Sequence, residues 1–370
     1  MIGNLPGYDF DGSLVTDVST NFDVVTQSAK ELTLLNIKSI SCQVQTFKVI
    51  KHSTLAMETP VLLLIFNRPD SAEQVVKAVR SARPSRIYIA ADGPRENRSG
   101  EAEQCIATRA AVLQQIDWDC ELKTLFRTEN LGCALAVSSA ITWFFQHEEM
   151  GIILEDDCLP DTSFFAFCSE LLYRYKDDHR IMHISGFNEQ TQSNHESSYY
   201  FSYYPSLWGW ATWRRAWAKY ELVPHPTADV EQQIVSTYFY GMTKVAQRWF
   251  RDFRHCLEKK SAWGYQWSYA IWKNHGLAIT ANVPLILNIG FDHRATHTSS
   301  EAPKSIRLMK LKSMDKILKH PLTYLPDSNA DITCFRNQHY PRLMERIKLR
   351  LASILSSPKN LNKIGGPATT

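Results

Sequence analysis

The sequence predicts an α/β fold with a mostly parallel central sheet, flanked by helices and followed by an aromatic-rich half. Three observations lead to this prediction. Apolar runs of strand length alternate with helical patterns between Val61 and Ile184, polar or turn-forming residues follow these runs, and aromatic residues gather between Tyr199 and Trp272. With 44% apolar and 21% charged residues in 370, the chain can build a sizeable core, which excludes global disorder.

The predicted elements follow one another regularly from residue 61. Strands are expected at Val61–Phe66, Ile87–Ala91, Leu122–Phe126, Gly151–Leu154 and Ile181–Ile184. Helices are expected at Ser71–Ala82, Glu101–Ile116, Leu131–Glu149 and Phe164–Tyr175. This alternation is typical of βαβ units around a buried parallel sheet. Right-handed crossovers place the carboxyl ends of such strands at one edge, where ligands of open α/β sheets bind.

Three regions are expected along the chain. Residues 1–57 are rich in Ser, Thr, Asn and Asp, and are expected to be an N-terminal extension, either disordered or a small packed lead-in. Residues 58–300 form the main domain, with a first half at 58–186 and a second at 187–300. Residues 301–370 are expected to form a helical segment and a disordered tail.

Composition and charge exclude several classes of protein. The formal net charge is only +3, which argues against a dedicated nucleic-acid binder. The eight cysteines form no C-x-x-C pair and are typical of reduced thiols. Because no apolar run reaches about 18 residues and the start lacks the pattern of a signal peptide, we expect a cytoplasmic protein.

The sharpest motif is the acidic triplet Glu155-Asp156-Asp157, which directly follows a buried strand. Three adjacent carboxylates repel one another, so a nearby cation would stabilise them. Mg²⁺ or Mn²⁺ fits, because each takes oxygen ligands and commonly shares them with substrate phosphates. The alternative is a solvated acidic turn.

Asp92 ends the second strand and is a second candidate. A carboxylate there can accept hydrogen bonds from a bound nucleotide, although Asp92-Gly93-Pro94 is also ordinary turn chemistry. The chain lacks the glycine-rich signatures of Rossmann dehydrogenases and P-loop NTPases, and the serine elbow of α/β-hydrolases. A nucleotide-diphosphate sugar held through a metal remains as the predicted ligand.

Several stretches carry a resemblance to a known family. They are FNRPDSAEQVVKAVR (66–80), IYIAADGPR (87–95), ENLGCALAVSSAITWFF (129–145), GIILEDDCLPDTSFF (151–165), WGWATWRRAW (208–217), WGYQWSYAIW (263–272) and NIGFDHRATHT (288–298). The set resembles the GT-A nucleotide-diphospho-sugar transferases, in particular a bacterial glycosyltransferase family labelled hemolysin-like. More distantly it is similar to the animal N-acetylglucosaminyltransferase that begins complex N-glycan branching. The resemblance covers roughly residues 58–300.

The resemblance implies a GT-A fold with a nucleotide-sugar half at 58–186, an acceptor half at 187–300, and a role for each matching residue. Asp157 would ligate the metal that bridges the donor diphosphate, and His297 could reach the same metal. The donor would be bound by residues at the strand ends, namely Asn67, Arg68, Asp92, Asn130, Glu155 and Asp156. A divalent metal with a basic residue can stabilise the departing nucleoside diphosphate.

The aromatic block suggests an acceptor groove. Trp side chains offer flat apolar area to the C–H faces of sugars, and the candidates are Trp208, Trp210, Trp263 and Trp267. The alternative for each is a place in the core. The predicted acceptor is a glycan or a lipid-linked glycan.

Gly264 departs from the family pattern. Related sequences carry an acid after the first Trp of WGYQW, and in the animal enzyme a similar motif supplies the catalytic base. Inverting transfer needs a base, for which Asp292 and Asp252 are candidates, while Gln266 remains as a polar contact at the catalytic site. Two alternatives stay open: a weak or inactive protein that binds nucleotide sugars or glycans, and a sugar nucleotidyltransferase.

The C-terminal region carries a basic amphipathic pattern. Leu343, Ile347, Leu351 and Ile354 recur at helical spacing among four basic residues. Such a helix can dock on an anionic membrane, which would place the protein at the inner face of the membrane, or it can pack on the domain.

Overall fold

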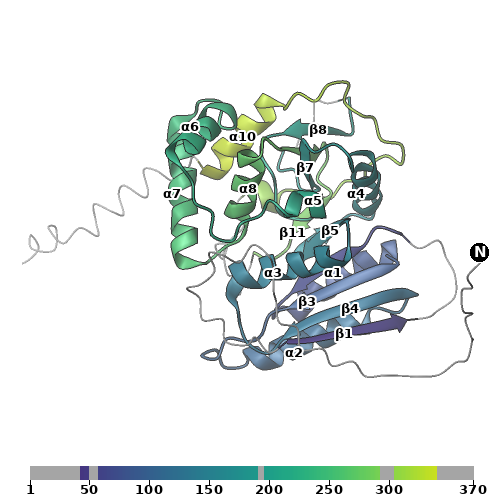
Figure 1. Cartoon of the computed structure of the whole chain (residues 1–370). Coiled ribbons are helices and arrows are strands. Elements are labelled where there is room, and N and C mark those ends of the chain that lie inside the picture. The colour runs from purple at the N-terminus through teal and green to yellow at the C-terminus, as the bar shows by residue number, and fades with distance from the viewer. Residues whose placement is uncertain (1–41, 50–56, 191–195, 292–303, 340–370) are drawn as a thin grey trace, which may run out of the picture. The chain divides into compact units, whose positions relative to one another are not determined.

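The computed structural model describes residues 42–49, 57–190, 196–291 and 304–339 (Figure 1). Every described residue belongs to one compact unit. Among the described helices, none combines the length and the apolar character that a bilayer crossing requires. The C-terminal amphipathic pattern lies outside the described residues, so membrane docking stays a prediction.

The core of the fold is a nine-stranded sheet. In spatial order its strands are β1 (Cys42–Val49), β4 (Cys120–Arg127), β3 (Arg86–Ala91), β2 (Val61–Ile65), β5 (Met150–Glu155), β9 (Trp210–Trp213), β7 (Ile181–Ser185), β10 (Leu277–Ala281) and β8 (Tyr199–Ser202). A separate two-stranded sheet pairs β6 (Cys158–Pro160) with β11 (Ile286–Asn288). The α/β class is therefore confirmed.

The prediction of a mostly parallel sheet is wrong, because the sheet is mixed. Neighbours β4, β3, β2 and β5 are parallel, as are β7 and β10. The pairs β1–β4, β5–β9, β9–β7 and β10–β8 are antiparallel. Strands β8 and β9 lie in the aromatic block, where the alternation of strands and helices stops, so no crossover helix imposes a parallel direction on them.

Helices cover both faces of the sheet. They are α1 (Pro69–Ala82), α2 (Glu101–Gln114), α3 (Gly132–His147), α4 (Ser163–Arg174), α5 (Arg214–Trp217), α6 (Ala228–Thr237), α7 (Thr243–Lys259), α8 (Gly264–Lys273), α9 (Lys304–Arg307) and α10 (Ser328–His339). In β2, Leu63 packs into a core with α1, α2 and α4, while Leu62 and Leu64 pack into a second core with α3, α7 and α8. This alternation follows from the two-residue period of a strand.

Strand β1 and helix α10 lie outside residues 58–300, in the two regions that flank the predicted main domain. Strand β1 lies within residues 1–57, where only an extension or lead-in is expected, and it pairs with β4 over its whole length. Helix α10 belongs to the predicted C-terminal helical segment. It is held by the buried Asp331, which accepts hydrogen bonds from Tyr203 N at 2.9 Å and from Tyr240 OH at 2.7 Å.

Candidate functional site

A cleft of about 1190 Å³ opens beside the carboxyl ends of β2, β3 and β5. Its lining includes Arg68 after β2, Asp92 after β3, and the acidic triplet at the end of β5. The opposite side is formed by 204–208 and 260–265 in the second half of the domain. The carboxyl ends of β2, β3 and β5 lie at one cleft, as predicted, because the three strands are parallel neighbours.

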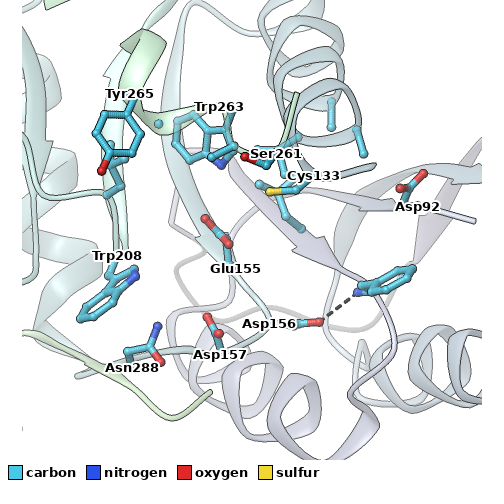
Figure 2. A pocket seen from close by; sticks show the side chains of 18 of the residues that line it. Asp92, Cys133, Glu155, Asp156, Asp157, Trp208, Ser261, Trp263, Tyr265 and Asn288 are labelled. Carbon is cyan, nitrogen blue, oxygen red and sulfur yellow. Dashed lines mark hydrogen bonds between the residues drawn. The ribbon is translucent and has the colours of Figure 1, made fainter. Parts of the chain in front are cut away.

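The three acids of the triplet do not point the same way. Figure 2 shows the Glu155 and Asp157 side chains within the cleft, while Asp156 turns toward the chain at Phe66. Asp156 Oδ2 accepts a hydrogen bond from Phe66 N at 2.9 Å, and Asp157 Oδ2 lies 3.0 Å from Arg68 Nη1. Glu155 is the last residue of β5, and Asp156 and Asp157 lie in the turn that follows it.

Burial and mutual repulsion act on this group together. Desolvation, followed by the negative charge of Asp157, raises the pKa of both Glu155 and Asp156 above the ordinary carboxyl range. Arg68 opposes the rise in both cases. The site therefore favours additional positive charge or proton uptake.

The donor set fits a hard divalent cation in part. Glu155 and Asp157 offer carboxylate oxygens from one side of the cleft, and Mg²⁺ often uses only one or two protein carboxylates. Within the described ranges, however, no three His, Cys, Asp or Glu side chains are grouped so that they could hold a metal ion by themselves. A cation here would have to complete its shell with ligands from a substrate or from water.

Gly290 is a site residue that sequence reasoning missed. A Cβ atom on Gly290 would overlap Asp157 Oδ2 and Arg68 Nη1, so the backbone of this residue passes directly over the ion pair. The neighbouring Ile289 N donates to the carbonyl oxygen of Asp157 at 2.8 Å. In the sequence, the glycine of Asn288-Ile289-Gly290 could have indicated a close approach of the backbone to another group. That this group is the pair Asp157 and Arg68 becomes evident only from the tertiary structure.

Asp92 lines the cleft, but its carboxylate is already engaged. Oδ1 accepts hydrogen bonds at 3.0 Å from Gly93 N and Leu131 N, and Oδ2 accepts at 3.1 Å from Gly132 N. Asn130 Nδ2 donates to the Gly93 carbonyl oxygen at 2.7 Å. Asp92 and Asn130, both predicted to bind a nucleotide, therefore also connect the turn after β3 to the start of α3.

A polar network beside Asn67 was not predicted. Asn67 Nδ2 donates to Glu101 Oε1 at 3.0 Å, and the same carboxylate accepts from Arg95 N at 2.8 Å and pairs with the Arg95 guanidinium. The hydrogen bond from the Arg95 side chain is the main cause that lowers the pKa of Glu101. Arg95 itself lines the cleft, so this network holds the positively charged guanidinium of Arg95 at the wall of the cleft.

The aromatic candidates divide into two pairs. Trp208 and Trp263 line the cleft. Trp210 and Trp267 are fully buried in the core and do not line it, so the expectation of an acceptor-binding role is corrected for these two. Trp210 stacks on Trp263 with ring centroids 5.6 Å apart, and thereby supports the wall from behind.

Of the predicted catalytic residues, Asp252 and Gln266 do not line the cleft. Asp252 lies on α7, where it pairs with Arg248 and Arg251, and it is not among the lining residues. Gln266 is buried on α8 and donates to the Ala262 carbonyl oxygen at 2.9 Å. The predicted base Asp292 and the predicted metal ligand His297 lie outside the described residues.

The chain matches no established protein-family model and no curated protein.

Proposed function

We propose that the protein is a metal-dependent, inverting glycosyltransferase of the GT-A type, which moves a sugar from a nucleotide-diphosphate donor to a glycan acceptor. The observation that carries the proposal is the convergence of three parallel strand ends on one cleft, with Glu155 and Asp157 facing it beside Arg68. Nucleotides bind at such edges of α/β sheets. The resemblance of residues 58–300 to this family supports the same assignment.

The donor half would recognise a diphosphate through opposite charges. Asp157 and Glu155 would hold Mn²⁺ or Mg²⁺, and the cation would neutralise charge on the departing nucleoside diphosphate. Arg68 Nη1 lies 3.0 Å from Asp157 Oδ2, so its guanidinium stands where it could also pair with a phosphate. Asn67, Asn130, Asp92 and Asp156 would shape the nucleotide pocket around them.

The acceptor half would present Trp208 and Trp263 to a sugar. Both rings line the cleft on the side opposite the acidic triplet. Aromatic faces bind the C–H surfaces of sugars, while polar groups at their edges give orientation. A lipid-linked acceptor would place the reaction at the cytoplasmic face of a membrane.

A second candidate function rests on Gly264. This residue lines the cleft at the start of α8 and carries no carboxylate where the family pattern has one. A protein that binds nucleotide sugars or glycans without transferring them would need no base. Release of nucleoside diphosphate from a donor distinguishes this candidate from a transferase.

The metal proposal is tested by calorimetry with UDP and GDP, each in Mn²⁺ and in EDTA. We expect Asp157→Asn to lower the Mn²⁺-dependent affinity by about 10-fold or more, because it removes a charged ligand. Asp119→Asn changes an exposed acid and serves as the matched control. Equal nucleotide affinity of the unmodified protein in Mn²⁺ and in EDTA would refute metal dependence.

Gly290→Ala perturbs the same pair without changing any charge. Its new methyl group would displace the Asp157 carboxylate or the Arg68 guanidinium, so nucleotide affinity should fall while the far-UV circular dichroism is retained. Unchanged affinity in this variant would show that the Arg68–Asp157 geometry is unimportant for binding.

A further inference from the structure

Glu189 follows β7 and lines the cleft, although sequence analysis did not single it out. Its place follows from two reversals of strand direction. Strand β9 is antiparallel to β5, and β7 is antiparallel to β9, so β7 runs in the same direction as β5. The carboxyl ends of β5 and β7 therefore lie at the same edge of the sheet, with β9 between them.

The surroundings of Glu189 connect it to the acceptor half. Burial is the main cause that raises the pKa of Tyr204, and the charges of Cys334, Glu189 and Tyr265 add to it. Tyr265 directly follows Gly264, and Tyr204 and Tyr265 both line the cleft. The carboxylate also interacts with the Cys334 thiol of α10. Glu189 therefore lines the same cleft as Gly264, the position where the family pattern has an acid.

Five carboxylates line the described cleft, and four of them belong to the donor side. Asp92 accepts backbone hydrogen bonds from the adjacent Gly93 and from Leu131 and Gly132 at the start of α3. Asp156 accepts from Phe66 N, and Asp157 pairs with Arg68. Glu155 stands beside Asp157 at the end of β5. Glu189 is the carboxylate of this set that lies outside these donor-side segments, after β7.

We infer that Glu189 is the general base of the proposed transferase and takes the place left by Gly264. This assignment rests on the proposed function. The Glu189 carboxylate removes the proton of the acceptor hydroxyl. At the same time, the oxygen of that hydroxyl forms the bond to the anomeric carbon. The bond from that carbon to the β-phosphate oxygen breaks, and its electron pair leaves with the nucleoside diphosphate. The proton on Glu189 then passes to solvent.

The test measures nucleoside diphosphate release from a panel of UDP- and GDP-hexoses with Mn²⁺, with water as the acceptor. We expect Glu189→Gln to lower kcat by about 100-fold or more, the usual contribution of a general base, while donor affinity by calorimetry stays within a few fold. The acidic limb of the pH–rate profile should disappear in Glu189→Gln and persist in Glu189→Asp.

Asp252→Asn is the matched control, because this acid lies on α7 outside the cleft, and it should keep both rate and pH profile. Donor binding with undiminished turnover in Glu189→Gln would overturn the assignment, as would loss of rate with an unchanged acidic limb. If the unmodified protein binds none of the donors, the proposed function fails first, and the role of Glu189 fails with it.

Discussion

His183 shows how a single residue couples the aromatic core to pH. Its ring is fully buried in β7 and stacks on Trp210 with centroids 5.0 Å apart. Trp267 Nε1 donates to His183 Nδ1 at 3.2 Å, so Nε2 must carry the proton that it donates to the Ser206 carbonyl oxygen at 2.8 Å. The neutral tautomer therefore satisfies both ring nitrogens.

We predict that this histidine makes folding sensitive to acid. Burial lowers the pKa of His183 to about 4, whereas an unfolded histidine titrates near 6.5. The unfolded state binds more protons between these two pH values. The contribution of neutral His183 to the free energy of unfolding is therefore complete above pH 6.5 and is lost as the pH falls toward 4, a change of about 3 kcal/mol. Urea unfolding between pH 4.5 and 7.5 measures it.

The comparison with His183→Gln isolates this effect. Buried acids such as Asp331, whose pKa burial raises to about 6, titrate in the same pH window, and their titration changes the free energy of unfolding in the opposite direction. When the free energy of unfolding of His183→Gln is subtracted from that of the unmodified protein, the contribution of these acids cancels. A difference that does not change with pH would contradict the prediction.

At the scale of elements, the start of α3 depends on a residue far away in sequence. Leu131 precedes the helix and gives no side-chain cap, so the first backbone N–H groups need another acceptor. Asp92, from the end of β3, accepts from Leu131 N and Gly132 N at 3.0–3.1 Å. The same carboxylate complements the positive end of the helix dipole.

We predict that Asp92→Asn destabilises the fold in the absence of any ligand. The amide group replaces one acceptor oxygen with a donor, so at least one N–H of the α3 start loses its partner. The free energy of unfolding should fall by about 1–2 kcal/mol, the usual cost of a lost cap. Urea unfolding against Asp119→Asn as a control measures it, and an unchanged midpoint would contradict the prediction.

At the scale of the whole molecule, the mixed sheet joins two differently built halves. One half has parallel strands with crossover helices, and the other has short strands embedded in aromatic clusters. Strand β1 closes the first half at its edge by pairing antiparallel with β4 from Cys42–Arg127 to Val49–Cys120. A sheet edge left unpaired is prone to association with other chains.

We predict different effects for two N-terminal deletions. Removal of residues 1–40 should leave the urea midpoint unchanged, because the compact unit of the described fold begins at Ser41. Removal of residues 1–56 also deletes β1, and should lower the free energy of unfolding by about 2–4 kcal/mol through lost ladder hydrogen bonds. It should also promote association visible by light scattering. Equal midpoints for both deletions would show that β1 adds nothing to the sheet.

Local sequence pattern was sufficient for the first half of the fold and for much of the candidate site. The apolar runs of β2, β3 and β5 are short, continuous and followed by polar turns, so their type and the edge of their ligand site can be predicted. The acidic triplet, Arg68 and Asp92 come to one cleft because parallel strands share a carboxyl edge.

Tertiary structure decided what local pattern cannot encode. Trp208 and Trp210 are two residues apart in one aromatic block, yet one lines the cleft and the other is buried, because only the pairing of β9 with β5 and β7 sets their environment. Gly290 matters through its approach to Asp157, which comes from a distant segment. Glu189 reaches the site through two strand reversals. Long-range pairing and close packing determine such placements, and neither leaves a periodic signal in the sequence.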